Sequence, residues 1–479
     1  NCGFVDIYYP KTRNTSYIIS ATARWVELAD IPGMFSRINL IHTSVVPPRS
    51  INSMMQKIGS MQFPVIKGKT GKDSLELDRP YIRTINKLQN SGWRINRRVL
   101  EVIEKNKEVF SSSIPFEDND AKELKRRSQA LEWSFIIAKA NILKDEDVFY
   151  QYLDADYRGR LYYKEPFLNY QGSDISRGML KFARAKPMTQ GGLYWLAVHT
   201  ATSFNASYGI DEIPEWCEAD YKSYLEEEGL DNISVDKMTL DDRVQWVNEN
   251  MDAIIDLGIN GEIDTTAEKI VTFLACCIEW SDYHKAVKDK RIYMSHLPIP
   301  IDGSNNGWQH LGAISKDTQT GDLVGLVPSE IQKDFYVQTA KELINLTEDE
   351  RLVDILSRMP MKRIRKGITK RGSMTRAYSA GAKKIAENMF FDCKAEDYHT
   401  EYGITQDDCN KFAKILIKAI NNVCPGPLQT MSYLQELAKY ELGSFLKVNE
   451  DGELAGEEYK VAVKRRSELF KTKDITDEE

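Results

Sequence analysis

The sequence predicts a helix-rich α+β fold. Apolar residues recur at spacings of three and four over long stretches, which is typical of amphipathic helices, whereas stretches with strand character are few and short. With 479 residues, the chain is about three times the size of a typical domain and can bury a large core without disulfide bonds.

Each expected element follows from its local pattern. Residues 159–163 and 293–301 have strand character, each beside a Gly-containing turn, although Pro298 and Pro300 weaken the second prediction. The aromatic residues of 194–196 and 273–280 are interpreted as core packing. Helical periodicity covers residues 95–109, 120–143, 267–283, 330–346, 369–389, 406–422 and 428–442.

The composition indicates a soluble, cytoplasmic protein, with a mitochondrial location left open. The seven cysteines include no C-x-x-C pair and the six histidines show no metal-ligand spacing. Reduced thiols follow, and we expect Cys276 and Cys277 to be ordinary buried thiols. No stretch approaches the roughly 18 apolar residues of a membrane helix, so no membrane contact is expected.

The net charge of −7 provides no general attraction to nucleic acid, so local basic density is the better test. Residues 361–371, MKRIRKGITKR, hold six cations among eleven residues. Arg94, Arg97 and Arg98 form a second cluster. This second cluster is either a solvated helix face or part of a nucleic-acid channel.

The stretch PIDGSNNGWQH, residues 300–310, contains an acidic turn. Asp302 followed by Gly303 is a common turn dipeptide. The same pair also suits a metal site, because Mg²⁺ is held by one or two rigidly placed carboxylates together with substrate phosphates. The end of a buried strand would supply the rigidity, and Gly303 would let a backbone carbonyl approach the same ion.

A second candidate site lies in the basic stretch. Lys366, Lys370, Met374 and Tyr378 recur every four residues and predict one slowly drifting stripe on a helix. Such a stripe is poor core material because buried ammonium groups need partners. It is either a solvated basic face or a phosphate clamp, with Lys370 and Arg371 on a triphosphate and Tyr378 on a base or sugar.

Further motifs occur in a fixed order along the chain. They are VVPP (45–48), QNSGWRIN (89–96), DYRGRLY (156–162), QGSD (171–174), KP (186–187), YWL (194–196) with His199, LACCIE (274–279), DGSNNGWQH (302–310), PSE (328–330), DFY (334–336) and TKRGSMTRAY (369–378). This collinear series resembles the single-subunit DNA-directed RNA polymerases of T7-like phages and mitochondria. DGSNNGWQH resembles polymerase motif A, and TKRGSMTRAY resembles motif B.

The resemblance implies roles for the acidic turn. Asp302 would hold both catalytic Mg²⁺ ions, with the Gly303 carbonyl assisting, and His310 would be a hydrogen-bonding group near the ribose. Related DNA polymerases carry a bulky glutamate at the position of Gly307, which blocks a ribose 2′-hydroxyl. A ribonucleotide therefore has room here.

The resemblance also implies roles for motif B and its surroundings. Lys366, Lys370 and Arg371 would bind the triphosphate, and Tyr378 would sense the sugar and stack at the insertion site. Two departures affect this assignment. The family usually has arginine where this chain has Lys366, which offers a point charge in place of a fork, and commonly has glycine where this chain has Ser379.

Two further residues are assigned by resemblance alone. Arg160 would contact the nucleotide or the RNA–DNA hybrid, and Tyr336 would support the nucleotide pocket. The implied architecture is that of a right hand: residues 1–105 as the end of an N-terminal domain, 106–148 as a thumb-like helical segment, 149–320 as the palm with motif A, and 321–479 as fingers with motif B.

One expected feature is missing from the sequence. The second metal aspartate of the family lies in a His-Asp dipeptide, and no histidine of this chain precedes an aspartate. The C-terminal part of the palm is therefore expected to be absent, as in a partial sequence cut at both ends. A natural second chain that carries the other carboxylate is the alternative explanation.

The function implied by the resemblance is template-dependent transfer of ribonucleoside monophosphates to an RNA 3′-hydroxyl, a nucleotidyltransferase reaction with two Mg²⁺ ions. Its partners would be a DNA template, the RNA product and ribonucleoside triphosphates. With one metal aspartate, this chain alone is expected to be weak or inactive. The alternative is a non-catalytic subunit of a split polymerase that binds nucleic acid and nucleotide. A DNA polymerase relative is disfavoured by Gly307.

Overall fold

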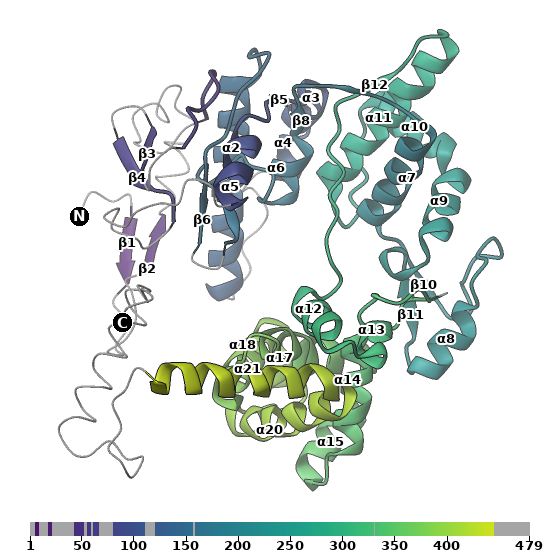
Figure 1. Cartoon of the computed structure of the whole chain (residues 1–479). Helices are drawn as coiled ribbons and strands as arrows, with labels where there is room; N and C mark the ends of the chain where they lie inside the picture. The colour runs from purple at the N-terminus through teal and green to yellow at the C-terminus, as the bar shows by residue number, and fades with distance from the viewer. Residues whose placement is uncertain are drawn as a thin grey trace. The chain divides into compact units, whose positions relative to one another are not determined.

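The structure is a computed structural model that describes residues 5–8, 18–21, 43–51, 55–58, 61–66, 80–110, 120–156, 159–329 and 331–444. The chain divides into two compact units. Unit 1 comprises Asn1–Ser207, Ser234–Asp236 and Leu240–Ile301, and unit 2 comprises Tyr208–Ile233, Lys237–Thr239 and Asp302–Glu479. Both units are rich in helices and their strands are two to four residues long, which confirms the helix-rich α+β prediction (Figure 1).

Unit 1 combines helices with short antiparallel ribbons (Figure 1). Its strand pairs are β1 (Val5–Tyr8) with β2 (Ile18–Ala21), β3 (Met55–Ile58) with β4 (Met61–Pro64), β5 (Trp93–Ile95) with β8 (Leu180–Phe182), β6 (Leu153–Ala155) with β7 (Leu161–Tyr163), and β9 (Lys186–Pro187) with β12 (Met294–Ser295). Its helices are α2 (Pro80–Gln89), α3 (Arg97–Lys105), α4 (Lys107–Phe110), α5 (Asp120–Leu143), α6 (Asp174–Gly178), α7 (Gln190–Phe204), α9 (Leu240–Glu249), α10 (Met251–Asn260) and α11 (Ile270–Lys288).

The core of unit 1 is built around α11. Every residue of this helix from Val271 to Ser281 is buried, which confirms the core interpretation of residues 273–280. Cys276 and Cys277 are fully buried thiols, as predicted, and burial raises the pKa of Cys276 to about 12. The core interpretation is wrong for Trp195, which is 42% exposed near the start of α7.

Unit 2 is almost entirely helical (Figure 1). Two short strands that pair with each other, β10 (Ser207–Gly209) and β11 (Asn232–Ser234), lie where the chain passes between the units, followed by the 3₁₀ turn η2 (Val235–Lys237). The helices of unit 2 are α8 (Tyr221–Glu228), α12 (Asn306–Ser315), α13 (Thr318–Leu323), α14 (Phe335–Asn345), α15 (Glu350–Arg358), α16 (Met361–Ile364), the π-helical turn η3 (Arg365–Thr369), α17 (Lys370–Arg376), α18 (Ala382–Ala395), α19 (Tyr398–Glu401), α20 (Gln406–Val423) and α21 (Pro425–Ser444).

The core of unit 2 gathers around α20, which packs against α14, α17 and α18. Phe412 and Leu416 of α20 are fully buried there. Helix α17 lies close to α20 because its Gly372 has no side chain. A Cβ at this position would lie 2.5 Å from Leu416 Cδ2. This close approach fixes the helix that carries the basic stretch.

The start of α20 is held by a buried carboxylate. Arg351 donates two hydrogen bonds of 2.8 Å to Asp408, one from Nε and one from Nη2, and Thr405 and Asp408 form a reciprocal capping box. Burial raises the pKa of Asp408, but the hydrogen bonds from Arg351 and Thr405 outweigh this effect and lower the pKa to about 2.

The predicted helix over residues 369–389 is wrong, because the structure breaks it into α17 and α18. Between the two helices Ser379 adopts a left-handed conformation with φ of 65°. Single residues in this conformation end helices, and glycine adopts it most easily. The departure from the family's usual glycine therefore falls on a backbone position that favours glycine.

The predicted strand over residues 293–301 shrinks to the two residues of β12. Proline cannot donate to a strand ladder, and Pro298 and Pro300 occupy the missing part. Ile301 is 83% exposed, so Asp302 does not follow a buried strand. Elsewhere the expected 95–109 helix divides at Asn106 into α3 and α4, and the other predicted helices agree within a few residues at their ends.

Candidate functional site

The acidic turn brings several oxygen atoms close together. Asp302 is exposed, and its Oδ1 accepts a hydrogen bond of 2.8 Å from the Gly303 amide. A Cβ at Gly303 would lie 2.2 Å from Asn306 Oδ1 and 2.9 Å from Gln309 Oε1, so these amide oxygens crowd the glycine. A carboxylate with neighbouring amide and carbonyl oxygens is the donor chemistry that Mg²⁺ prefers. The residues present therefore fit Mg²⁺.

The carboxylate supply of this turn is limited. Within the described ranges, no group of three or more His, Cys, Asp and Glu residues gathers to hold a metal ion. Asp302 is thus the carboxylate that the turn itself contributes, and the metal ion would take its remaining ligands from water and substrate phosphates.

A buried tryptophan ties motif A to motif B. Trp308 on α12 is fully buried, and its Nε1 donates a hydrogen bond of 2.9 Å to the Ser373 carbonyl on α17. Its ring packs against Phe335 at 5.4 Å between centroids. The two motifs, more than sixty residues apart in the sequence, are therefore fixed to each other within unit 2.

Gly307 lies directly against the end of motif B. A Cβ at Gly307 would be 2.6 Å from Ala377 Cβ and 3.4 and 3.5 Å from two ring atoms of Tyr378. A contact of 2.6 Å is shorter than packed carbon atoms tolerate. The glycine that the sequence linked to sugar choice and the tyrosine assigned to sugar sensing are thus neighbours in space.

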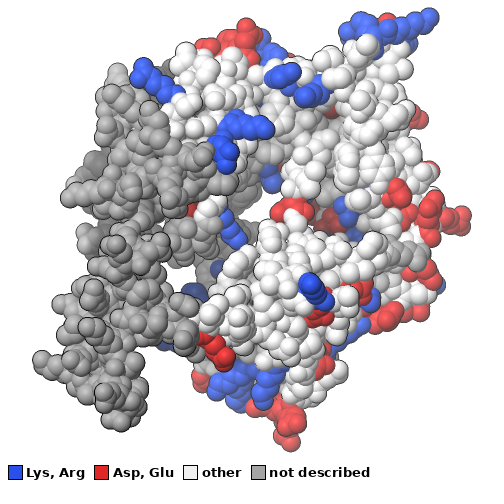
Figure 2. Space-filling model, in the orientation of Figure 1, with Lys and Arg blue, Asp and Glu red and all other residues white. Residues whose placement is uncertain are grey.

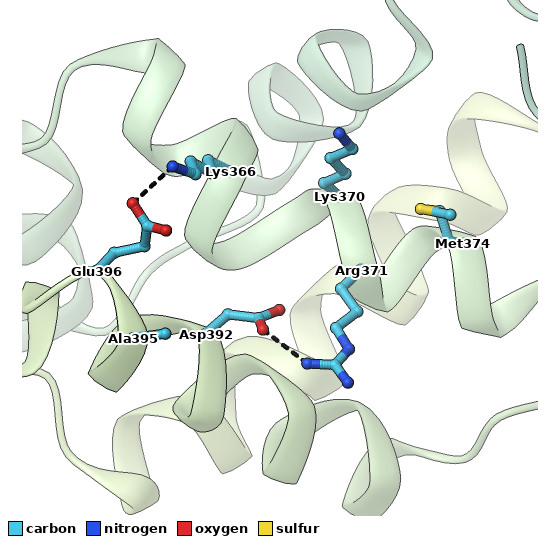
Figure 3. A pocket seen from close by; sticks show the side chains of 7 residues that line it. All are labelled: Lys366, Lys370, Arg371, Met374, Asp392, Ala395 and Glu396. Carbon is cyan, nitrogen blue, oxygen red and sulfur yellow. Dashed lines mark hydrogen bonds and ion pairs between the residues drawn. The ribbon is translucent and has the colours of Figure 1, made fainter. Parts of the chain in front are cut away.

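The basic stretch forms one side of a pocket of about 260 Å³ (Figure 3). Lys366 lies in η3, while Lys370, Arg371 and Met374 belong to α17. The facing wall belongs to α18 and the residue after it. The residues of that wall are Asp392, Ala395 and Glu396.

Two ion pairs cross this pocket (Figure 3). Lys366 Nζ lies 2.6 Å from Glu396 Oε2, and Arg371 Nη1 lies 2.7 Å from Asp392 Oδ1. The lysine and arginine side chains are 56% and 45% exposed. Exposed ion pairs contribute only about 0–1 kcal/mol to stability, because water screens both partners. These two pairs can therefore exchange partners at little cost.

Three other cations of the basic stretch bond to neighbouring segments of unit 2. Arg365 Nε lies 2.7 Å from Asp334 Oδ2, and Lys362 Nζ bonds to Asn232 Oδ1 at 3.0 Å. Arg363 pairs with Glu401 and bonds to the Tyr402 hydroxyl. On the face that Figure 2 shows, basic and acidic groups of the described residues are interspersed. These three cations thus have bonding partners that do not line the pocket.

The predicted stripe is confirmed for three of its four members. Lys366, Lys370 and Met374 line the pocket together, with Lys366 inside the π-helical turn η3 and Lys370 directly after it. Tyr378 does not line it, because α17 ends at Arg376 and the tyrosine lies past this end, against Gly307. Single π-helical turns are frequent at functional sites.

The other predicted site residues are distributed more widely. Tyr336 is buried on α14 with Arg365 5.4 Å above its ring, and burial raises its pKa to about 12. His310 is exposed on α12. Arg160 belongs to unit 1, where its amide bonds to Asp156 Oδ1 at 3.0 Å. Arg158 of the same motif lies outside the described residues.

The second basic cluster bonds largely within unit 1. Arg98 donates to Asp282 and to the Gly258 carbonyl, each at 2.6 Å, and Arg97 Nε donates to the Lys144 carbonyl at 2.6 Å. These contacts join α3 to α10, to α11 and to the end of α5. They give both arginines a structural role.

Sequence reasoning missed two residues of the pocket, Asp392 and Glu396. Their spacing of four residues in FFDCKAE was a readable signal, since it places both on one face of a helix. The sequence did not reveal that this face meets the basic stretch, because the turn that includes Ser379 sets the direction of α18.

Comparison with known proteins identifies the family. The sequence model of the DNA-dependent RNA polymerase family matches residues 186–464, more than half of the chain. The chain belongs to this family. This finding confirms the resemblance that the motifs indicated.

Individual relatives agree with the family assignment. The chain is 25% identical over 430 residues to DNA-directed RNA polymerase 1, mitochondrial, of Arabidopsis thaliana, which covers 81% of this chain and 40% of that protein. It is 26% identical over 398 residues to DNA-directed RNA polymerase 3, chloroplastic, of Nicotiana sylvestris, covering 74% of this chain and 37% of that protein. The chain thus spans about 40% of the length of the curated relatives it matches.

Proposed function

We propose that this chain contributes the nucleotide-binding and sugar-selecting part of a DNA-directed RNA polymerase, a nucleotidyltransferase. The observation that carries the proposal is the contact between Gly307 and Tyr378, held in place by the bond from Trp308 to Ser373. Because Gly307 has no side chain, motif A offers the tyrosine only backbone at this contact. Family membership supports the interpretation that a tyrosine without a bulky neighbour at this position accepts a ribose with its 2′-hydroxyl.

The proposed reaction joins a ribonucleotide to RNA. The RNA 3′-oxygen forms a bond to the α-phosphorus while the bond from that phosphorus to pyrophosphate breaks, and the hydroxyl proton passes to water. Lys370 binds the triphosphate, together with Lys366 and Arg371 from the pocket wall. Tyr378 stacks at the insertion site, His310 hydrogen-bonds near the ribose, and Tyr336 buttresses the pocket from behind.

Asp302 and the Gly303 carbonyl would hold Mg²⁺ at the acidic turn. When bound, the ion supplies positive charge that activates the attacking hydroxyl and stabilises the leaving pyrophosphate. A second carboxylate, from elsewhere in the protein or from a second chain, would complete the site. We further propose Arg160 as a contact to the nucleotide or hybrid, a DNA template and an RNA product as partners, and thumb, palm and fingers at the boundaries expected from the sequence.

The compartment is part of the proposal. The relatives carry mitochondrial and chloroplastic names, which favours an organelle as the place of action over the cytoplasm expected from composition. Among the described residues, no helix combines the length and the apolarity needed to cross a membrane.

The test is ribonucleotide incorporation on an RNA primer annealed to a DNA template, with Mg²⁺. The chain is measured alone and together with the polypeptide encoded directly downstream. We expect incorporation in the mixture, its loss in Asp302→Ala, and no change in the matched control Asp289→Ala, whose carboxylate pairs with Arg291 on unit 1.

Two outcomes would contradict the proposal. If Asp302→Ala incorporates ribonucleotides as well as the unchanged chain does, the acidic turn does not hold the metal ion. If every mixture binds the primed RNA–DNA template but none incorporates ribonucleotides, the chain is a non-catalytic binding subunit and not a polymerase.

A further inference from the structure

The nucleotide pocket contains its own anions. Three cations and two carboxylates line it, so one positive charge remains in excess. Both carboxylates face the cations from α18 and the residue after it, and each is engaged with one of them (Figure 3). A site built only to attract phosphate would leave these positions neutral, because each carboxylate repels the ligand and occupies a donor.

The two pairs are separated by about one helical turn on each side of the pocket. Asp392 and Glu396 are four residues apart, and their partners Arg371 and Lys366 are five residues apart across the π-helical turn. Each carboxylate accepts a charge-assisted hydrogen bond from the group that would otherwise donate to a phosphate oxygen. Phosphate and carboxylate therefore compete for the same donors.

We propose that Asp392 and Glu396 are built-in counter-ions that compete with the substrate's phosphates for Arg371 and Lys366, and so keep the affinity for pyrophosphate low enough for its release. The inference rests on the proposed nucleotide site. On entry, a triphosphate displaces both carboxylates from their cations. After the reaction, the carboxylates bond again to the same cations and displace the leaving pyrophosphate.

The exposure of the pairs agrees with this exchange. The Glu396 and Asp392 side chains are 33% and 22% exposed, so each can turn toward water when a phosphate takes its partner. Neither carboxylate is locked in a core where separation would leave a buried, unpaired charge. The two pairs differ in this respect from the buried Asp408 at the start of α20.

The experiment is a calorimetric titration of the whole chain with inorganic pyrophosphate and with tripolyphosphate. Low ionic strength limits the screening of the charges, and a chelator removes metal ions. The variants are Asp392→Asn, Glu396→Gln and the double variant, which remove charge with little change in shape. The matched control is Glu387→Gln on the same helix α18, whose carboxylate pairs with Lys384 outside the pocket. Lys370→Ala reports on the phosphate site itself.

We expect the double variant to bind pyrophosphate about 3- to 10-fold more tightly than the unchanged chain. The gain is modest because the competing ion pairs are exposed, and exposed ion pairs are weak. Each single variant should show part of this gain, Glu387→Gln none, and Lys370→Ala a loss. The gain should shrink as salt is added, because salt screens the competing charges. Unfolding by urea confirms that each variant is folded before titration.

The outcomes separate this inference from the proposed function. If the unchanged chain binds and Lys370→Ala weakens binding, but the double variant matches Glu387→Gln or binds more weakly, the counter-ion role is wrong and the nucleotide site stands. If only the double variant binds, the counter-ion role is supported. If neither the unchanged chain nor the double variant binds pyrophosphate or tripolyphosphate, both proposals fail.

Discussion

The segment from η3 to the turn after α17 is held by different forces on its two faces. Toward the pocket, Lys366 and Arg371 meet carboxylates through ion pairs that water reaches. Toward α12, Ser373 accepts a bond from the fully buried Trp308, and Tyr378 lies against Gly307. The electrostatic face can exchange partners, whereas the packed face is fixed. The proposed nucleotide site would use both, the exchangeable pairs to bind and release a charged ligand and the fixed packing to select its sugar by shape.

The largest effect is expected at the packed face, in Trp308→Ala. Loss of this buried ring and of its bond to Ser373 should lower the free energy of unfolding by about 3–5 kcal/mol. Urea denaturation followed by circular dichroism measures the change. Trp195→Ala is the matched control, because Trp195 is 42% exposed. Similar losses in the two variants would mean that α12 and α17 are not fixed by packing.

A smaller loss of folding stability is expected from Asp408→Asn. This variant tests how much a buried ion pair stabilises the same unit. The pKa of Asp408 is about 2 in the folded state against an ordinary value of 3.8. A lowered pKa stabilises the fold above pH 3.8 and this stabilisation disappears as the pH falls toward 2. Stability measured from pH 5 to pH 2 should therefore fall less steeply in Asp408→Asn than in the control Asp407→Asn. Parallel curves would contradict the assignment.

A gain in folding stability is expected from Ser379→Gly, at the turn that ends the packed face. Glycine relieves the left-handed strain at φ of 65° but adds freedom to the unfolded chain and loses the bond from Gln435 to the serine hydroxyl. The net gain should be about 0.5 kcal/mol. Ser379→Ala keeps the strain and loses the bond, so it should destabilise. If both variants change stability in the same direction, strain is not the cause.

The smallest effect on stability is expected at the electrostatic face, in Lys366→Met. Its exposed pair with Glu396 should change the free energy of unfolding by less than about 0.5 kcal/mol. Binding of tripolyphosphate should nevertheless weaken and depend less on salt. Lys384→Met on α18 is the matched control, with the same small change in stability and unchanged binding. A large loss of stability in Lys366→Met would show that this face is not exchangeable.

Sequence reasoning succeeded where one segment carries its own information. The helices at 120–143 and 406–422, the buried stretch around Cys276 and the shared face of Lys366, Lys370 and Met374 were all predicted from periodicity. It failed where the conformation of a single residue ends a helix, as at Ser379, and where the exposure of a side chain depends on residues distant in the sequence, as at Trp195.

The sequence by itself determined the family, the helix-rich class and the residue types of the site, because motif order and local periodicity are properties of the chain alone. Only the tertiary structure decided which groups meet. It placed Gly307 against Tyr378 and brought Asp392 and Glu396 to the basic stretch. The physical reason is that contacts between distant segments depend on turns and helix packing, and neither leaves a periodic signal in the residues that finally touch.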